Sequence, residues 1–378
     1  MKRLSIASLA ARVPNTVNGV GLVLFVEQLT GSTAAAGVAT GLFTLSWGAS
    51  SPLQGRLIDH LGPRRVLPWL AICQAAGLLA LIVLGLSGVP EVALFALCFV
   101  AGWGQAPWGD VVRSVLPTLI AEPLVPAAFA LDAALMELLW IAGPLATGVT
   151  TAILSPQVAL LGASACALTG AAFFVTSPAL RGWQSEQRQD RHPLGALRSL
   201  GVRIIVLAIF PAGVSCGVLE LAVTQFAKDA GQIGATGALI AAWSASSALA
   251  GFTLGLRAWS WSLPGQWLAM LLLLTLTSAP LLLASSVAGM AALVFVAGAW
   301  LAPLIALTSQ LLGRQAPPGM RTEAFSWGPT SLIIGAAMGT LLGGYLAEHQ
   351  GWQWAIVACV ATAAIGTAVA RLGRSRLI

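Results

Sequence analysis

The sequence predicts an all-α polytopic membrane protein with twelve transmembrane helices in two parallel six-helix repeats. Composition, the spacing of apolar stretches and an internal repeat all point to this class. Of the 378 residues, 57% are hydrophobic and 8% are charged, and the mean hydropathy is +0.87. A soluble domain carries about 25% charged residues. The composition therefore excludes a secreted disulfide scaffold, a nucleic-acid-binding domain and an enzyme with a large water-exposed catalytic domain.

Apolar stretches long enough to cross a bilayer follow one another along the whole chain. A span needs about 20 apolar residues, and only a helix satisfies its own backbone in lipid. The first stretch is long and interrupted by polar residues, so it is not interpreted as a signal peptide. The spans are expected near 5–28, 33–55, 65–87, 91–113, 124–152, 156–178, 204–227, 233–256, 264–285, 288–312, 322–346 and 352–371.

A polar stretch at 181–203 separates the sixth span from the seventh. It is expected to be a cytoplasmic linker between an N-terminal bundle, 1–180, and a C-terminal bundle, 204–378. With the N-terminus placed in the cytoplasm, only Lys228 falls on an outer loop and Arg12 falls inside a span. The other 17 of the 19 Lys and Arg residues then lie on the inner side, as the positive-inside rule requires. Both termini are therefore expected to be cytoplasmic, in a bacterial inner membrane.

The two halves resemble each other in sequence. "AGWGQAP" at 101–107 matches "AGAWLAP" at 297–303, 196 positions later. The same offset pairs Gly143 with Gly339 and Gly148 with Gly344. Because each half has six spans, both halves enter the membrane from the same side, which predicts parallel repeats.

The residues that usually carry metal or cofactor chemistry are scattered. The five cysteines lie in apolar runs without C-x-x-C spacing, and the three histidines lie far apart. We interpret the cysteines as packing residues. No phosphate-binding G-x-x-x-x-G-K-[ST] motif is present. The expectation is no catalytic residue, no metal and no cofactor.

The segment after the second span reads "GRLIDHLGPRR", from Gly55 to Arg65. It resembles the signature loop between helices 2 and 3 of the major facilitator superfamily, roughly G-x-L-x-D-[RK]-x-G-x-[RK]-[RK]. His60 departs from the usual basic residue of that pattern. Independently of the family, Gly55 and Gly62 permit a tight turn and a close helix approach.

The resemblance implies a conformational latch. In the family, the aspartate at the position of Asp59 caps the start of helix 11 and pairs with arginine in the outward-open state. Here the expected partners are Arg64, Arg113 and the chain near Thr322. Asp110 is expected to pair with Arg56, Arg64 or Arg113. The alternative is that these charges, Arg65 among them, only set topology.

The fifth span contains "ELLWIAGPLATG", in which Gly143 and Pro144 resemble the core of the family's helix-5 antiporter motif. Leu139 replaces an expected glycine, and Gly148 stands one place late. The resemblance favours export in exchange for protons. The alternative is an ordinary kinked helix.

Ionisable residues inside the spans are functional candidates because charges are costly in lipid. Arg12 and Asp132 lie at similar depth in spans 1 and 5 and are expected to pair, in a structural or a gating role. Glu137 lies about 20 Å into span 5, and Glu220 is its nearest counterpart in the other half. Glu137, Glu220 and Asp132 are the candidate proton-coupling residues. The alternative for Glu137 and Glu220 is a protonated carboxyl group that bonds a neighbouring helix.

A substrate cavity is expected between the halves, lined by polar and aromatic side chains. Asn15 and Asn18 share the broad face of Arg12, and tryptophans beside carboxylates suit an amphipathic or cationic substrate. The cavity candidates are Arg12, Asn15, Asn18, Trp103, Gln105, Trp140, Trp300 and Gln310.

The sequence thus predicts a secondary transporter, most simply a proton-coupled exporter of a small organic molecule working by alternating access. A proton symporter or uniporter of a sugar or metabolite is the alternative. A membrane-embedded enzyme or sensor is more remote, because no convergent acid, base or metal set is apparent. The expected partners are a small-molecule substrate, protons and the lipid bilayer, with no nucleic acid, and the chain is expected to be a monomer.

Overall fold

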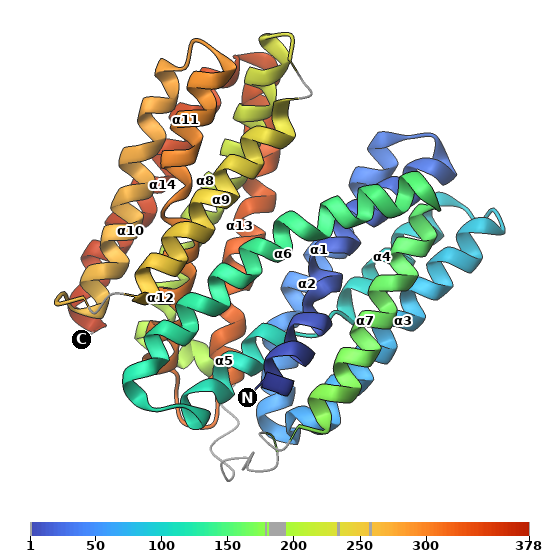
Figure 1. Cartoon of the computed structure of the whole chain (residues 1–378), viewed down its shortest axis with the longest axis horizontal. Coiled ribbons are helices and arrows are strands. Elements are labelled where there is room, and N and C mark those ends of the chain that lie inside the picture. Colours follow the sequence, from blue (N-terminus) through green and yellow to red (C-terminus); the bar gives the residue numbers. More distant parts are fainter. Residues whose placement is uncertain (1, 178–179, 181–193, 233–234, 257–258, 378) are drawn as a thin grey trace. The chain divides into compact units, whose positions relative to one another are not determined.

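The computed structural model describes residues 2–177, 180, 194–232, 235–256 and 259–377, and these form helices and connecting turns without a strand (Figure 1). The all-α fold predicted from composition is confirmed. The α-helices are α1 Lys2–Thr30, α2 Thr33–Leu61, α3 Pro63–Leu86, α4 Glu91–Trp103, α5 Trp108–Leu119, α6 Val125–Ile153, α7 Pro156–Val175, α8 Leu200–Asp229, α9 Thr236–Leu256, α10 Leu263–Ser278, α11 Val287–Gly298, α12 Leu301–Gln315, α13 Arg321–His349 and α14 Trp352–Gly373.

Two of the predicted spans are each divided into two helices. The span expected near 91–113 consists of α4 and α5, and the span expected near 288–312 consists of α11 and α12. Both divisions fall within the repeated "AGWGQAP" and "AGAWLAP" segments. With these pairs joined, eleven segments of the described chain are long and apolar enough to cross a membrane. The remaining long helix, α2, has 29 residues and is rich in glycine, serine and threonine.

Local sequence explains several helix boundaries. The Ser32 hydroxyl caps α2 by accepting a hydrogen bond from the N–H of Ala35. Gly62 separates α2 from α3 with a φ of 83°, and Pro63 follows as the first residue of α3. Such a φ favours glycine, and proline is well suited to the first helical position. The turn in the signature loop is therefore built by its own glycine and proline.

The helices gather into two compact units. The first unit comprises Met1–Ile120, Leu139–Gly195 and Pro317–Ser326. The second comprises Ala121–Leu138, Ala196–Ala316 and Trp327–Ile378. Helices α6 and α13 each contribute residues to both units. The predicted division at 180 and 204 stays a prediction, and residues 181–193 of the predicted linker lie outside the described residues.

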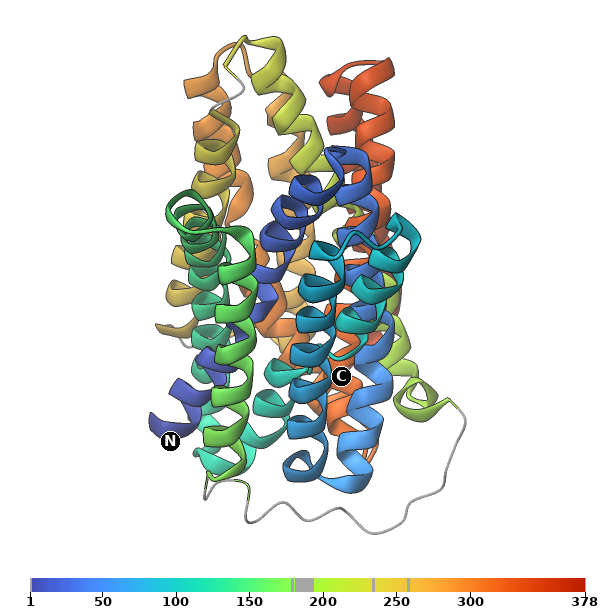
Figure 2. The same ribbon diagram turned by 90° about the vertical axis from the view of Figure 1, so that its right-hand side faces the viewer.

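Within the first unit, α1 runs along α7, while α2 packs on α4 and α3 packs on both α4 and α7 (Figures 1 and 2). Its core includes Leu22, Phe25, Leu78 and Leu160. Within the second unit, α8 packs on α14, α9 on α11 and α12, and α10 on α12 and α14. Small residues let α8 and α13 approach closely, since a side chain at Gly213 would strike the backbone of Leu332.

The internal repeat reappears in the packing of three glycine pairs, each 196 positions apart. Every one of these glycines lies so close to a neighbouring helix of its own unit that an added Cβ atom would clash with it. The pairs are Gly102 and Gly298, against Phe43 of α2 and Trp243 of α9; Gly143 and Gly339, against Thr16 of α1 and Val214 of α8; and Gly170 and Gly366, against Ala11 of α1 and Ala208 of α8. The same close approaches are therefore built twice in one chain.

Candidate functional site

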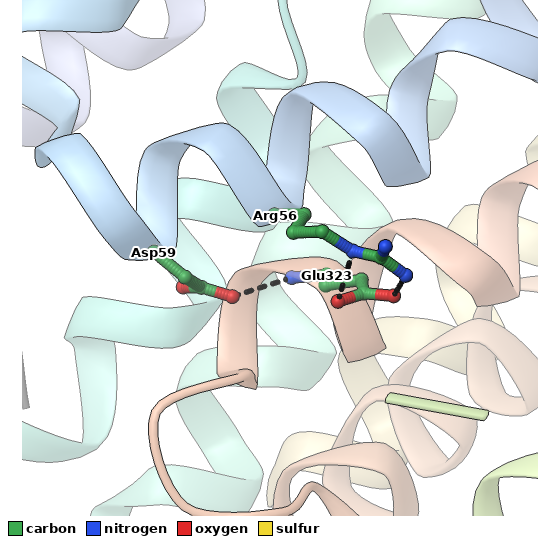
Figure 3. Close-up of polar contacts among 3 residues, drawn as sticks. All are labelled: Arg56, Asp59 and Glu323. Atoms are coloured by element: carbon green, nitrogen blue, oxygen red, sulfur yellow. Dashed lines mark hydrogen bonds and ion pairs between the residues drawn. The ribbon is translucent and has the colours of Figure 1, made fainter. Parts of the chain in front are cut away.

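Asp59, at the end of α2, caps the start of α13 (Figure 3). Its Oδ1 accepts a hydrogen bond from the N–H of Thr322 at 3.0 Å, and its Oδ2 accepts one from the N–H of Glu323 at 2.9 Å. Thr322 and Glu323 are buried. The first N–H groups of a helix have no partner inside it, and a carboxylate also suits the positive end of the helix dipole. One side chain therefore satisfies two amides that lie far from it in the sequence.

Arg56 and Glu323 form a two-pronged ion pair beside this cap (Figure 3). Arg56 Nε donates to Glu323 Oε2 at 3.1 Å, and Nη2 donates to Oε1 at 2.9 Å. The Glu323 side chain is only 1% exposed. The hydrogen bond with the Glu323 carboxylate raises the pKa of the Arg56 guanidinium. Sequence reasoning missed Glu323, although an acid in the first turn of a helix that follows a loop was a usable signal.

Two glycines make room for this contact. A Cβ atom on Gly55 would lie 2.9 Å from Cα of Glu323, so α2 can approach α13 only because the side chain is absent. Gly195 has a φ of 51°, and a Cβ there would strike both Oε1 of Glu323 and Nη2 of Arg56. The backbone at Gly195 therefore lies directly against the ion pair.

Burial dominates the ionisation of Asp59. Desolvation raises the pKa of Asp59 from its ordinary 3.8 to about 7, against the opposing effect of hydrogen bonds from Glu323 and Thr322. Asp59 therefore titrates near neutral pH while it occupies this contact.

Arg64 of the signature loop binds the end of a neighbouring helix. Arg64 Nε donates to the carbonyl oxygen of Val175, in the last turn of α7, at 2.9 Å, a typical use of a cation at a helix C-terminus. Arg65 is exposed. Arg113 Nη1 lies 3.8 Å from Oδ1 of Asp110, which is one of the partners expected for Asp110.

A buried amide network in the first unit joins α1 and α3 at the break between α4 and α5. Gln105, in the break, accepts hydrogen bonds from Asn18 Nδ2 at 3.1 Å and from Gln74 Nε2, and donates to Asn15 Oδ1 at 2.9 Å. The structure thus brings together three of the predicted cavity residues. Gln74 was missed, because a single glutamine in an apolar span gives no periodic signal. Asn18 Oδ1 is buried and has no hydrogen-bond partner among the described residues.

The other predicted cavity residues are more dispersed. Arg12 is buried, and Cζ of its guanidinium lies 3.5 Å from the position that a Cβ atom on Gly109 would occupy. Trp300 is fully buried, whereas Trp103 and Trp140 are 44% and 48% exposed. Gln310 is half-buried. The pairing of Arg12 with Asp132 stays a prediction.

In the second unit, Glu137 of α6 and Ser247 of α9 are both buried. Cys216, on α8, lies within electrostatic range of both Glu137 and Glu220. Glu220, one turn further along α8 than Cys216, is exposed. Within the described ranges, no group of three His, Cys, Asp or Glu side chains could hold a metal ion.

The helix-5 motif lies in the half of α6 that belongs to the first unit. Gly143 lies against Thr16 of α1, and its carbonyl oxygen accepts a hydrogen bond from Thr147. Pro144 lies inside α6, and no heavy atom comes within 4 Å of the Cβ position of Gly148. Gly143 thus serves close packing, whereas Gly148 has open space.

Similar solved structures support this architecture. A bacterial homologue of the iron transporter ferroportin, in an outward-facing state, is 14% identical with a TM-score of 0.80, and the match covers 99% of each chain. The human organic anion transporter MFSD10 is 15% identical with a TM-score of 0.71, covering 97% of this chain and 96% of the other. The E. coli fucose:proton symporter FucP is 16% identical with a TM-score of 0.74, covering 98% and 97%. At these identities the likeness shows the fold alone.

No curated protein sequence matches the chain at a significant level. The family model described as Major Facilitator Superfamily matches residues 4–262, which is more than half of the chain. The signature loop, the twelve-helix expectation and the structural likeness agree with that match. The chain belongs to the major facilitator superfamily, whose members transport small molecules across membranes by alternating access.

Proposed function

We propose that this transporter exports a small organic molecule in exchange for protons. The observation that carries the proposal is Glu137, a buried carboxyl group in the middle of a membrane-spanning helix. A carboxyl group at such depth is costly unless it is used. Glu137 can gain and lose a proton, so it can exchange a proton for a substrate as the access of the site changes.

Export is favoured by the Gly143–Pro144 pair of α6, which resembles the antiporter motif. Glu220, an exposed residue of α8, is a second carboxyl group for the proton or for a cationic substrate. Trp300 adds an aromatic surface whose indole N–H has no partner among the described residues. This set suits an amphipathic molecule with a positive charge or a hydrogen-bond acceptor.

Proton symport of a hydroxyl-rich solute is the second candidate. It is favoured by the amide network around Gln105, because amides donate and accept hydrogen bonds without charge. The fucose:proton symporter among the similar structures is consistent with this candidate. In either case we propose a monomer in a bacterial inner membrane with both termini in the cytoplasm, as the distribution of arginines predicts.

The direction in which the probe moves relative to the proton distinguishes antiport from symport. Thermal-shift screening against fluorescent organic cations and hexoses selects a probe, since a ligand of the folded state raises its melting temperature. The selected probe is then followed in inverted vesicles that are acidified inside. Antiport predicts accumulation of the probe against its gradient. Symport predicts its expulsion, and a response to the probe gradient alone would contradict proton coupling.

The cytoplasmic contact would then control access. We propose that Asp59, Arg56 and Glu323 hold α2 against α13 in one state of the cycle and separate in the other. Gly55 and Gly62 would allow the close approach and the turn of this segment, and Arg64 would hold it to the end of α7. Arg65, Asp110 and Arg113 are the remaining charges of the proposed latch.

A further inference from the structure

We infer that the second unit binds the phosphate groups of anionic phospholipids at one end of its helix bundle. The binding surface consists of five exposed arginines, named here the arginine surface: Arg203, Arg314, Arg371, Arg374 and Arg376. They lie at the end of the unit that the distribution of charged residues predicts to be cytoplasmic. The inference goes beyond the proposed transport function and does not depend on Glu137.

The ends of α8, α12 and α14 meet at this surface, close to the C-terminus marked in Figure 1. A side chain at Gly201, in the first turn of α8, would strike the side chain of Gln315, the last residue of α12. Gln315 Nε2 donates to the carbonyl oxygen of Leu377 at 3.4 Å. A side chain at Gly373, the last residue of α14, would strike Ile204 of α8. Each arginine of the surface lies within two residues of one of these contacts.

The start of α10 adds an aromatic edge to the arginine surface. Arg374 Nη2 lies 3.2 Å from the position that a Cβ atom on Gly265 would occupy. The next residue, Gln266, donates through Nε2 to the carbonyl oxygen of Trp261 at 2.8 Å. Trp261 is 59% exposed, and its ring lies edge-on to that of Trp259 with 6.3 Å between the ring centroids. Tryptophan is enriched at the boundary between membrane and water, so this pair marks the level of the lipid headgroups.

The positive charge of this surface is not balanced by neighbouring acids. The segments that form this end of the unit contain no Asp or Glu; they are residues 196–210, 259–268, 310–316 and 366–377. In the part of the chain that the structure describes, none of the five guanidinium groups makes a hydrogen bond or an ion pair. By contrast, Arg56, Arg64 and Arg113 each have a partner in the first unit. The donors of the arginine surface are therefore available to an anion from outside.

Helix stabilisation accounts for only part of this arrangement. Arg314 and Arg371 lie in the last turns of α12 and α14, where a cation complements the helix dipole. Arg203 instead lies in the first turn of α8, at the positive end of that helix, where a cation is unfavourable. The folded chain nevertheless holds Arg203 beside the other arginines. This repulsion is relieved when an anion binds among them.

The chemistry of the surface favours a phospholipid over a soluble anion. A guanidinium group can bind two oxygens of one phosphate at once, and every basic residue of the surface is an arginine. Leu372 lies beside Arg371 and is 83% exposed, so an apolar side chain adjoins the charges. A lipid can place its phosphate on the arginines and its acyl chains against Leu372 and Trp261. A soluble phosphate would use the charges alone.

Native mass spectrometry of the full chain in a neutral detergent tests the inference. It measures the dissociation constants of phosphatidylglycerol, of phosphatidylcholine, whose choline group neutralises its phosphate, and of soluble glycerol phosphate. Phosphatidylglycerol is expected to bind about tenfold more tightly than phosphatidylcholine. Each arginine near an anionic headgroup contributes about fivefold. Arg374→Gln/Arg376→Gln is therefore expected to weaken phosphatidylglycerol binding about 25-fold and to leave phosphatidylcholine binding unchanged.

Two further variants separate this surface from the net charge of the protein. Arg374→Lys/Arg376→Lys keeps both charges and is expected to lose much less affinity than the glutamine pair. Lys228→Gln removes an exposed positive charge at the opposite end of α8 and is expected to have no effect. If the glutamine pair fails to fold, Arg314→Gln/Arg371→Gln takes its place, with the same expected loss.

Three results would overturn the inference: equal affinity of the native protein for the two lipids, undiminished affinity in the glutamine pair, or an equal loss per charge in Lys228→Gln. Glycerol phosphate that binds as tightly as phosphatidylglycerol would overturn the assignment to lipid in favour of a soluble phosphate. None of these measurements involves transport, so the inference and the proposed function fail separately.

Discussion

Replacing Asp59 by alanine removes both acceptors from the start of α13. Thr322 and Glu323 are residues with exposed fractions of 0% and 1%, and their amides then lose hydrogen bonds of 3.0 and 2.9 Å. A buried donor left without a partner costs about 1–3 kcal/mol. Partial hydration of the helix end lowers the combined cost of the two unpaired amides. We expect a loss of about 3 kcal/mol in the local stability of this contact, or roughly 100-fold in its opening equilibrium.

Hydrogen exchange followed by mass spectrometry measures this opening directly. The protection of the peptide that contains Thr322 and Glu323 is expected to fall about 100-fold in Asp59→Ala. The matched control is Leu61→Ala, an exposed position two residues further along α2, which is expected to leave protection unchanged. A decrease of less than about threefold in Asp59→Ala would show that these amides do not depend on the carboxylate.

Three further predictions concern the first unit. Burial raises the pKa of Asp59 from 3.8 to about 7, so Asp59 binds a proton more tightly in the closed contact than in water. Protonation of Asp59 therefore stabilises the contact at low pH, and this contribution is lost as the pH rises from about 4 to about 7. Exchange of the same amides, corrected for intrinsic rates, is expected to be slower at pH 5 than at pH 8, and slower exchange at pH 8 would refute this pH dependence. Gly195→Ala places a methyl group against Glu323 and Arg56 at a φ of 51°, and is expected to raise exchange at Glu323, whereas an unchanged rate would show that the segment moves aside without cost. Gln105→Leu removes three hydrogen bonds, and is expected to cost about 3 kcal/mol and lower the melting temperature by several degrees, against little change for Gln28→Leu at an exposed position of α1.

The membrane fold follows from the sequence because hydropathy is a sum over many residues. The helical spans and the offset between the halves needed no tertiary information. The divisions at Gln105 and Trp300 were missed, although Pro107 and Pro303 stand in the repeated segments. Proline is tolerated in membrane helices, so its presence alone does not decide between a kink and a break.

The candidate site was only partly predictable, because it depends on pairs that are far apart in the chain. The aspartate of the signature loop and the start of the eleventh span were expected to meet, but Glu323 as the partner of Arg56 was not. Arg64 was expected beside Asp59 and instead binds the end of α7 through Val175.

Proton movement coupled to the probe tests the central claim most directly. Proteoliposomes containing a pH-sensitive dye report internal pH when the probe selected by thermal shift is added, with native protein compared with Glu137→Gln. The account predicts a pH change that follows probe movement in the native protein and disappears in the variant, while binding of the probe is retained. A pH change of equal size in both proteins would contradict it.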